Sequence, residues 1–308
     1  MSEFRVNSIT NQDGSAGPQV CGVSTFSGKS GVQIPSGPTE FRRQDGGGRG
    51  RGIIAGGITP SNQDMIDSIE IATLGNSTDF GDLTYGRAIK DVGCSSATRA
   101  LFGGGYIVGS GDSNVIDFVV ISSGGGANDF GNLNVATLRD GGKVCNSTRG
   151  IWAGGQVIPS TSPGTTNIIQ FVTMATTGNA TDFGDLTKDR RDAYGVQSST
   201  RGVFAGQETK SPSSAAVNVL DFITIATTGN AQDFGDLVNP ANSAAAGNAT
   251  RGLIVTNDGS STQSIQMATK GNSITFGTLS VTRSSLNATS SPSRVVFVGG
   301  VDYPAYYN

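Results

Sequence analysis

Short apolar stretches recur along the chain at nearly constant intervals, with polar segments between them. Each stretch directly follows an Arg and most end in a Gly pair, as in Arg51–Gly57, Arg99–Gly105 and Arg149–Gly155. The six copies start at Arg51, Arg99, Arg149, Arg201, Arg251 and Arg294. The interval is about 50 residues, and a fixed period of this length indicates a repeat architecture.

Two further landmarks keep the same phase. A second apolar segment follows each Arg stretch, at residues 65–72, 115–122, 168–175, 219–226 and 264–268. A Phe-Gly dipeptide then begins at Phe80, Phe130, Phe183, Phe234 and Phe276. Gly-Asn pairs such as Gly229-Asn230 lie between these two landmarks and favour a tight hairpin connection, because both residues tolerate positive φ.

The pattern within one copy predicts β-strands. The stretch after the Arg is continuously apolar, which is typical of a strand buried on both faces. Residues 218–226 carry β-branched and aromatic side chains on both parities, so this strand also needs cover on both faces. We therefore expect an antiparallel meander of about four strands per copy, which must pack between its neighbours.

The predicted fold class is all-β, a β-propeller formed by residues 51–308 and preceded by an extended N-terminal arm and Gly/Arg hinge at residues 1–50. Six Arg stretches but only five Phe-Gly strands leave the number of blades open. We favour six, with the last blade formed by residues 280–308 and completed by N-terminal strands at Gln19–Phe26 and Gly31–Ile34, because such closure removes free edges. Five blades with a surplus final strand is the alternative.

Composition excludes several kinds of chemistry. The chain has 46 Gly in 308 residues, no His, 15% charged residues and a net charge of −3. Without His there is no imidazole acid or base and no His-ligated metal. No carboxylate departs from the repeat pattern to mark a glycosidase pair. We expect no enzymatic activity, no catalytic residue, no metal and no cofactor.

Motifs that suggest nucleotide or metal chemistry fit a structural interpretation better. Gly22–Ser30 is similar to a phosphate-binding loop, but five residues rather than four separate its glycines, and an extended segment follows. Asp-Phe-Gly recurs in register, as a strand position does. We expect the repeated Arg to pair with Asp82, Asp185 and Asp236 or with backbone groups. Cys94 and Cys145 occupy similar places in adjacent copies, and we expect buried thiols that lie close together.

The strand that ends in Gly-Gly, and the Phe-Gly strand with a Leu three residues on (Phe80 and Leu83), resemble kelch repeats over about residues 51–300. Phe stands where kelch repeats carry Trp, and Thr256-Asn257 replaces the Gly pair of the fifth copy. The resemblance implies a kelch-like β-propeller.

A second resemblance is to kelch-like structural proteins of tailed bacteriophages, especially cyanophages. Their repeats have the form Ile-Ala-Thr-Thr-Gly-Asn-Ala-Thr-Asp-Phe-Gly-Asp-Leu, which residues 225–237 match with one difference. Residues 2–10 and 31–37 are similar to the N-terminal segment of phage tail-fibre and appendage proteins. This resemblance implies a virion protein assembled in the host cytoplasm, used for particle assembly and host-surface recognition. A capsid decoration protein and a glycan-active propeller enzyme are the alternatives.

Partner contacts are expected in the arm and in the variable connections that follow the Gly pairs. Residues 1–50 would bind other virion proteins, and the ring would bind a host glycan or protein as a homo-oligomer. The net charge favours no nucleic acid, and no apolar run is long enough for membrane insertion. The candidate partner-binding residues are Tyr106, Ile107, Asp112, Gln156, Gln207, Glu208, Lys210, Asp258, Tyr303, Tyr306 and Tyr307. The candidate anchor residues are Phe4, Val20, Val23, Phe26, Val32 and Ile34.

Overall fold

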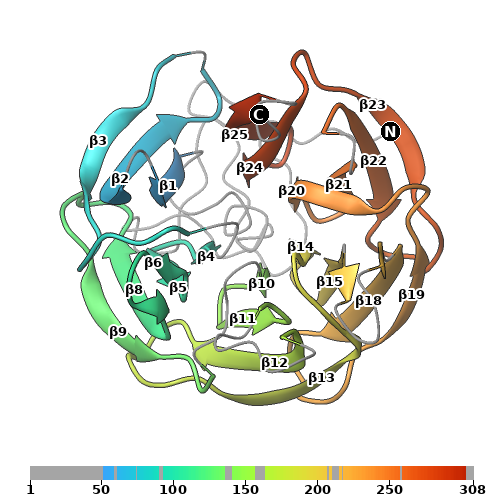
Figure 1. The fold of residues 1–308 in the computed structure, drawn as a ribbon, viewed down its shortest axis with the longest axis horizontal. Helices are drawn as coiled ribbons and strands as arrows, with labels where there is room; N and C mark the ends of the chain where they lie inside the picture. Colours follow the sequence, from blue (N-terminus) through green and yellow to red (C-terminus); the bar gives the residue numbers. More distant parts are fainter. Residues whose placement is uncertain are drawn as a thin grey trace, which may run out of the picture. The chain divides into compact units, whose positions relative to one another are not determined.

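The structure, a computed structural model, shows a ring of small antiparallel β-sheets around a central axis (Figure 1). It describes residues 51–58, 61–73, 75–89, 93–135, 141–156, 164–206, 208–209, 215–216, 218–256 and 259–302. All of them belong to the compact unit Glu40–Asn308. The expected strands at Gln19–Phe26 and Gly31–Ile34 lie outside the described residues.

Five sheets form the blades. Blade 1 contains β1 (Arg51–Ile58), β2 (Asn62–Glu70) and β3 (Thr78–Asp82). Blade 2 contains β4 (Gly93–Ser95), β5 (Arg99–Gly103), β8 (Val115–Val120) and β9 (Asn128–Asn132). Blade 3 contains β10 (Gly142–Cys145), β11 (Arg149–Ala153), β12 (Thr166–Thr173) and β13 (Thr181–Arg190). Blade 4 contains β14 (Tyr194–Gln197), β15 (Arg201–Ala205), β18 (Val219–Thr224) and β19 (Gln232–Asp236). Blade 5 contains β20 (Ala241–Gly247), β21 (Arg251–Thr256), β22 (Ser261–Gln266) and β23 (Ile274–Thr278).

Three smaller sheets have two strands each. Two of them are hairpins within connections: β6 (Tyr106–Ile107) with β7 (Gly111–Asp112), and β16 (Glu208–Thr209) with β17 (Ala215–Ala216). The third, which we call the terminal sheet, pairs β24 (Arg283–Ser290) with β25 (Val295–Asp302). Figure 1 shows the terminal sheet between blade 5 and blade 1.

The predicted fold class, an all-β propeller built from antiparallel meanders, is confirmed. The preference for six blades is wrong: the sixth Arg stretch forms β25, whose sheet contains only two of the described strands, so five blades are formed. Within a complete blade, the first strand lies nearest the axis and the fourth lies on the rim (Figure 1). The second strand begins with the repeat Arg, and the fourth carries Phe-Gly. Blade 1 lacks a first strand among the described residues.

The core lies between the blades, as the sequence pattern predicted. After its Arg, β5 is fully buried through Gly103, and β18 is buried on both faces from Leu220 to Ile223. One continuous apolar cluster joins Phe80 of blade 1, Leu101 of blade 2 and Trp152 of blade 3. Stability therefore depends on contacts between neighbouring sheets, because no single sheet can bury both of its faces.

The expected tight hairpins at the Gly-Asn pairs are wrong. Residues 225–231 separate β18 from β19, and this connection extends to the preceding blade. The Gly229 N–H donates to the carbonyl of Phe183 at 2.7 Å, and the Ala231 N–H to that of Asp185 at 2.8 Å. We call such a pair of backbone hydrogen bonds a latch. Latches join blades 1 to 2, 2 to 3, 3 to 4 and 4 to 5; their glycine bonds run from Gly125 to Phe80, Gly178 to Phe130, Gly229 to Phe183 and Gly271 to Phe234.

Among the described residues, no helix is long and apolar enough to cross a membrane.

Candidate functional site

The repeat Arg of blades 1 to 4 joins its blade to the next. The Arg99 guanidinium donates to the carbonyl of Ala175 at 2.9 Å, and the Arg149 guanidinium to the carbonyl of Ile225 at 2.8 Å. Each guanidinium also lies over a Phe ring of its own blade, with Arg149 at 4.6 Å from the centroid of Phe171. Of the two expected roles, bonding to the backbone is confirmed. No ion pair to Asp82, Asp185 or Asp236 is present within the described part of the chain.

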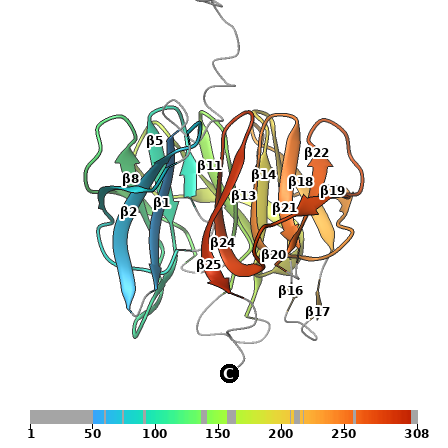
Figure 2. The same ribbon diagram turned by 90° about the horizontal axis from the view of Figure 1, so that it is seen from above.

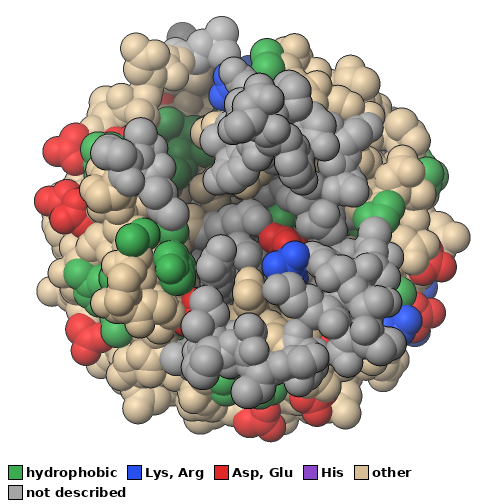
Figure 3. All heavy atoms as spheres, in the orientation of Figure 1, with side chains coloured by type: hydrophobic (Ala, Val, Ile, Leu, Met, Phe, Trp, Pro, Cys, Tyr) green, Lys and Arg blue, Asp and Glu red, His purple; other side chains and the backbone are tan. Residues whose placement is uncertain are grey.

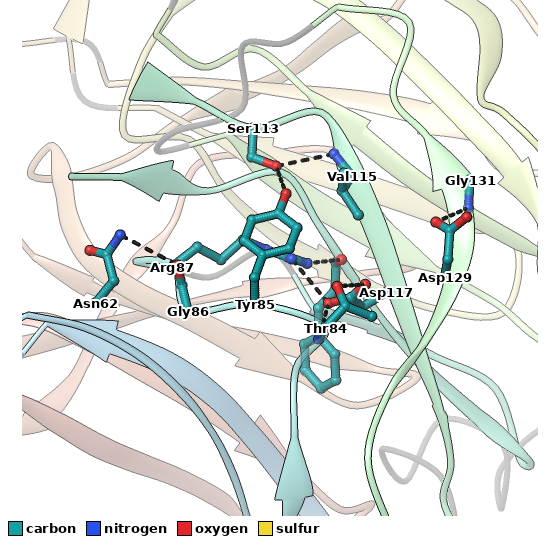
Figure 4. Close-up of polar contacts among 11 residues, drawn as sticks. Asn62, Thr84, Tyr85, Gly86, Arg87, Ser113, Val115, Asp117, Asp129 and Gly131 are labelled. Atoms are coloured by element: carbon teal, nitrogen blue, oxygen red, sulfur yellow. Dashed lines mark hydrogen bonds and ion pairs between the residues drawn. The ribbon is translucent and has the colours of Figure 1, made fainter. Parts of the chain in front are cut away.

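A buried ion pair, which the sequence analysis missed, fixes the link between blades 1 and 2. Arg87 and Asp117 are both fully buried, with 3.0 Å between the guanidinium Nη1 and the carboxylate Oδ2. Asp117 also accepts from the Thr84 amide at 3.1 Å and from the Thr84 hydroxyl at 2.7 Å. Arg87 in turn donates to the Phe102 carbonyl at 3.0 Å. Figure 4 shows Thr84, Arg87 and Asp117 of this group.

The position of Asp117 has an equivalent at each of the other described junctions between blades, and the residue there is either Asp or Gln. Between blades 3 and 4, Arg190 pairs with Asp221, and Thr187 donates to the same carboxylate. At the other two junctions, a Gln side-chain oxygen accepts the hydrogen bond instead of a carboxylate. The Asn134 amide donates to Gln170 at 2.7 Å, and the Val238 amide donates to Gln263 at 3.1 Å. Each buried carboxylate at this position is paired with an Arg of the preceding link, because a buried charge needs a partner. Burial lowers the pKa of Arg190, and the attraction of Asp221 opposes this.

The connection between β5 and β8 is held by this network. The Ala88 and Tyr106 backbones exchange two hydrogen bonds of 2.8 and 2.9 Å, and the Tyr85 hydroxyl bonds the Ser113 hydroxyl (Figure 4). The predicted contact residues Tyr106, Ile107 and Asp112 are consequently only half exposed. Val108 at the tip of the hairpin is 60% exposed, so the tip is the part that a partner would reach first.

The other predicted contact residues lie in equivalent connections. Gln156 follows β11 and forms an isolated bridge with Thr165, and Glu208 begins β16. Every second strand runs in the same direction around the ring, since each starts at the Arg that reaches the next blade. The connections after the second strands therefore leave from one end of the ring, where Figure 2 shows β16 and β17.

Several predicted residues lie outside the described residues. They are Gln207, Lys210, Asp258, Tyr303, Tyr306 and Tyr307 among the candidate contacts, and Phe4, Val20, Val23, Phe26, Val32 and Ile34 among the candidate anchors.

The two cysteines of the first strands meet at the axis. The expected proximity is confirmed: the thiols of Cys94 and Cys145 interact directly, and the Ser95 amide donates to the Cys145 sulfur at 3.3 Å. Both are free and buried beside an axial pocket lined by the inner strands. Burial raises the pKa of Cys94, whereas the hydrogen bond from Cys94 lowers the pKa of Cys145. The described residues contain no cluster of three metal-binding side chains.

Charged side chains are spread out on the face of the ring that Figure 3 shows. Acidic groups form small separate sets around the rim among mostly uncharged polar surface. This distribution differs from the concentrated basic surface that strong binding of nucleic-acid phosphates requires.

No protein-family model matches the sequence, and no curated protein is significantly similar to it.

Proposed function

We propose that this chain is a non-enzymatic structural protein of a tailed-phage particle, in which the ring is a rigid support for variable loops. One observation carries the proposal. The strands and their contacts between blades repeat, whereas the connections after the second strands differ, at residues 59–61, 104–114, 154–165, 206–218 and 257–260. Variable loops on a repeated scaffold are typical of a surface that binds partners.

Chemistry supports the same role. Among the described residues, the fully buried charged side chains are Arg87, Asp117, Arg190 and Asp221, and all four join neighbouring blades. Their charges are neutralised within the ring rather than directed into a cleft. We propose that the loops contact other particle proteins or the host surface, while residues 1–50 attach the ring to the particle.

The experiment is to replace the chain in the phage genome by a form that lacks residues 1–45 and to purify the particles. We expect the complete chain to be present in wild-type particles, and the shortened chain to fold but to be absent from them, as measured by quantitative mass spectrometry. Absence of the complete chain from particles would exclude the virion role. Incorporation of the shortened chain would exclude the arm as anchor.

A second measurement separates the structural role from the enzymatic alternative. Purified chain is incubated with host surface polysaccharide, and release of reducing ends is followed. We expect no turnover. Turnover that is abolished by replacing one or two Asp or Glu residues would identify a glycan-active enzyme.

A further inference from the structure

One junction of the ring carries no latch among the described residues. The terminal sheet has two described strands, so the described part of the chain contains no connection between a third and a fourth strand after blade 5 and no fourth strand before blade 1. In Figure 1, β23 and β3 lie on the rim at either side of the terminal sheet. Half of a latch is therefore left on each side: an acceptor strand on blade 5 and a donor connection on blade 1.

The acceptor half is apolar and exposed. Phe276 of β23 is 52% exposed, whereas its four counterparts Phe80, Phe130, Phe183 and Phe234 are buried, at 8, 2, 3 and 2%. Ile274 on the same strand is 64% exposed, and Val281 just beyond it is 49% exposed. These three are among only seven large hydrophobic side chains exposed in the described residues, so the patch is unusual for this molecule.

The donor half keeps the residues of a working latch. Gly75, Asn76 and Ser77 repeat the Gly271-Asn272-Ser273 sequence of blade 5, and all three are exposed. In blades 3, 4 and 5 this Asn has a definite role, because Asn179, Asn230 and Asn272 each accept the amide of a fourth-strand residue, at 3.0, 3.0 and 2.9 Å. Asn76 carries the same side chain, but the described residues contain no fourth strand of a preceding blade with which it could bond.

Backbone geometry also separates the free acceptor strand from the latched ones. The fourth-strand glycines Gly131, Gly184 and Gly235 have φ of 142°, 143° and 145°, and Gly81 has 145°. Gly277 of β23 does not share this positive φ. The free acceptor strand therefore differs in backbone conformation from its latched counterparts.

We propose that a second copy of this chain closes these two half-latches. The connection at residues 75–77 of one copy binds β23 of the other, with Gly75 donating to the carbonyl of Phe276 and Ser77 donating to that of Thr278. The Asn76 side chain accepts the Thr278 amide, as Asn272 accepts the Asp236 amide within the chain. Phe276 becomes covered as its counterparts are.

A second copy is the partner that fits both halves. Each copy carries one donor half and one acceptor half, and both border the same gap. A two-fold rotation that brings the gaps of two rings together places each donor opposite the other's acceptor, so the assembly closes as an isologous pair. The contact is small and belongs to the weak class of interfaces. It does not depend on the particle to which the chain belongs.

The test is sedimentation equilibrium of the full chain and of two variants, each of which breaks one half. Phe276→Glu charges the acceptor, and the double variant Asn76→Ala, Ser77→Pro removes the acceptor oxygen and the donor amide of the connection. We expect the wild type to dimerise and either variant to raise the dissociation constant by about tenfold or more. The altered side chains are exposed, so circular dichroism should stay at the wild-type spectrum and the unfolding midpoint should fall only slightly.

A mixture of the two variants tests directly whether the donor half of one copy binds the acceptor half of the other. One latch remains intact in the mixed pair, because the double variant keeps its acceptor and Phe276→Glu keeps its donor. We expect the mixture to associate more strongly than either variant alone. Val238→Glu, which charges another exposed apolar residue away from the gap, is the control and should dimerise as the wild type does.

Three results would overturn the proposal. The wild type could stay monomeric, whether β23 remains bare or another segment occupies it. Either variant could dimerise normally. The mixture could fail to associate better than its components.

Discussion

The Arg294 guanidinium donates to the main-chain carbonyl of Ala72 at 3.1 Å, and the two residues are 222 positions apart. This bond joins the last strand of the ring to the first blade by the same interaction that joins consecutive blades. Arg51, Arg99, Arg149 and Arg201 make it too, whereas Arg251 contacts only the Phe276 ring among the described residues. Arg251 lacks a carbonyl partner there because the terminal sheet has no third strand in the described part of the chain.

That difference predicts unequal roles for identical residues. Arg149→Ala should lower the free energy of unfolding by about 1.5–3 kcal/mol, since a charge-assisted bond to the Ile225 carbonyl is lost. Arg251→Ala should cost about 0.5–1 kcal/mol, the range of an exposed cation–π contact. Equilibrium unfolding in urea measures both, and equal losses would show that the carbonyl bond contributes nothing.

The latches make a second prediction about two glycines of the Phe-Gly strands. A Cβ on Gly131 would lie 2.4 Å from the Gly178 carbonyl oxygen, and its φ of 142° disfavours any side chain. Gly131→Ala should therefore destabilise the ring by about 2 kcal/mol or more. Gly277→Ala is the matched control, since the nearest atom to its Cβ is 4.0 Å away. We expect its thermal midpoint to equal that of the wild type when both are compared as monomers at low protein concentration, and a large fall for Gly277→Ala would refute the steric explanation.

The buried ion pair gives a third prediction. Asp117→Ala leaves Arg87 buried without its carboxylate, and we expect a loss of about 3–5 kcal/mol in the free energy of unfolding. Gln170→Ala removes the corresponding neutral group of blade 3 and should cost about 1–3 kcal/mol, because only one amide loses its acceptor. Chemical denaturation compares the two. A smaller loss for Asp117→Ala than for Gln170→Ala would contradict the charge argument.

The cysteines at the axis provide a fourth prediction, on pH. A thiol reacts as its thiolate, so the raised pKa of Cys94 should slow its alkylation and the lowered pKa of Cys145 should favour its own. In a Cys21→Ser chain treated with iodoacetamide near pH 8, we expect Cys145 to be modified first and Cys94 only at higher pH. Peptide mass spectrometry follows both sites.

Unfolded chain is the control for the alkylation experiment, because both thiols then react at similar rates. Faster modification of Cys94 than of Cys145 in the folded ring would contradict the assigned directions of the two pKa values.

Local pattern predicted most of the fold. The apolar stretch after each Arg predicted the second strand of each blade, and the repeated Phe-Gly dipeptide predicted the fourth. Both predictions rest on the fact that buried strand positions need apolar residues, which makes the pattern visible in the sequence. The proximity of Cys94 and Cys145 followed from equivalent positions in adjacent copies. The pairing of Arg87 with Asp117 was missed, since the two lie 30 residues apart and only the packing of neighbouring blades brings them together.

The sequence by itself determined that the chain is an all-β ring of repeated meanders, because each copy carries the same alternation of buried strands and turns. Only the tertiary structure decided how many blades form and which repeated residues are engaged. Phe276 looks like its counterparts in the sequence, yet it is exposed whereas they are buried. The physical reason is that a latch needs the outer strands of a neighbouring blade, and the two described strands of the terminal sheet do not include them.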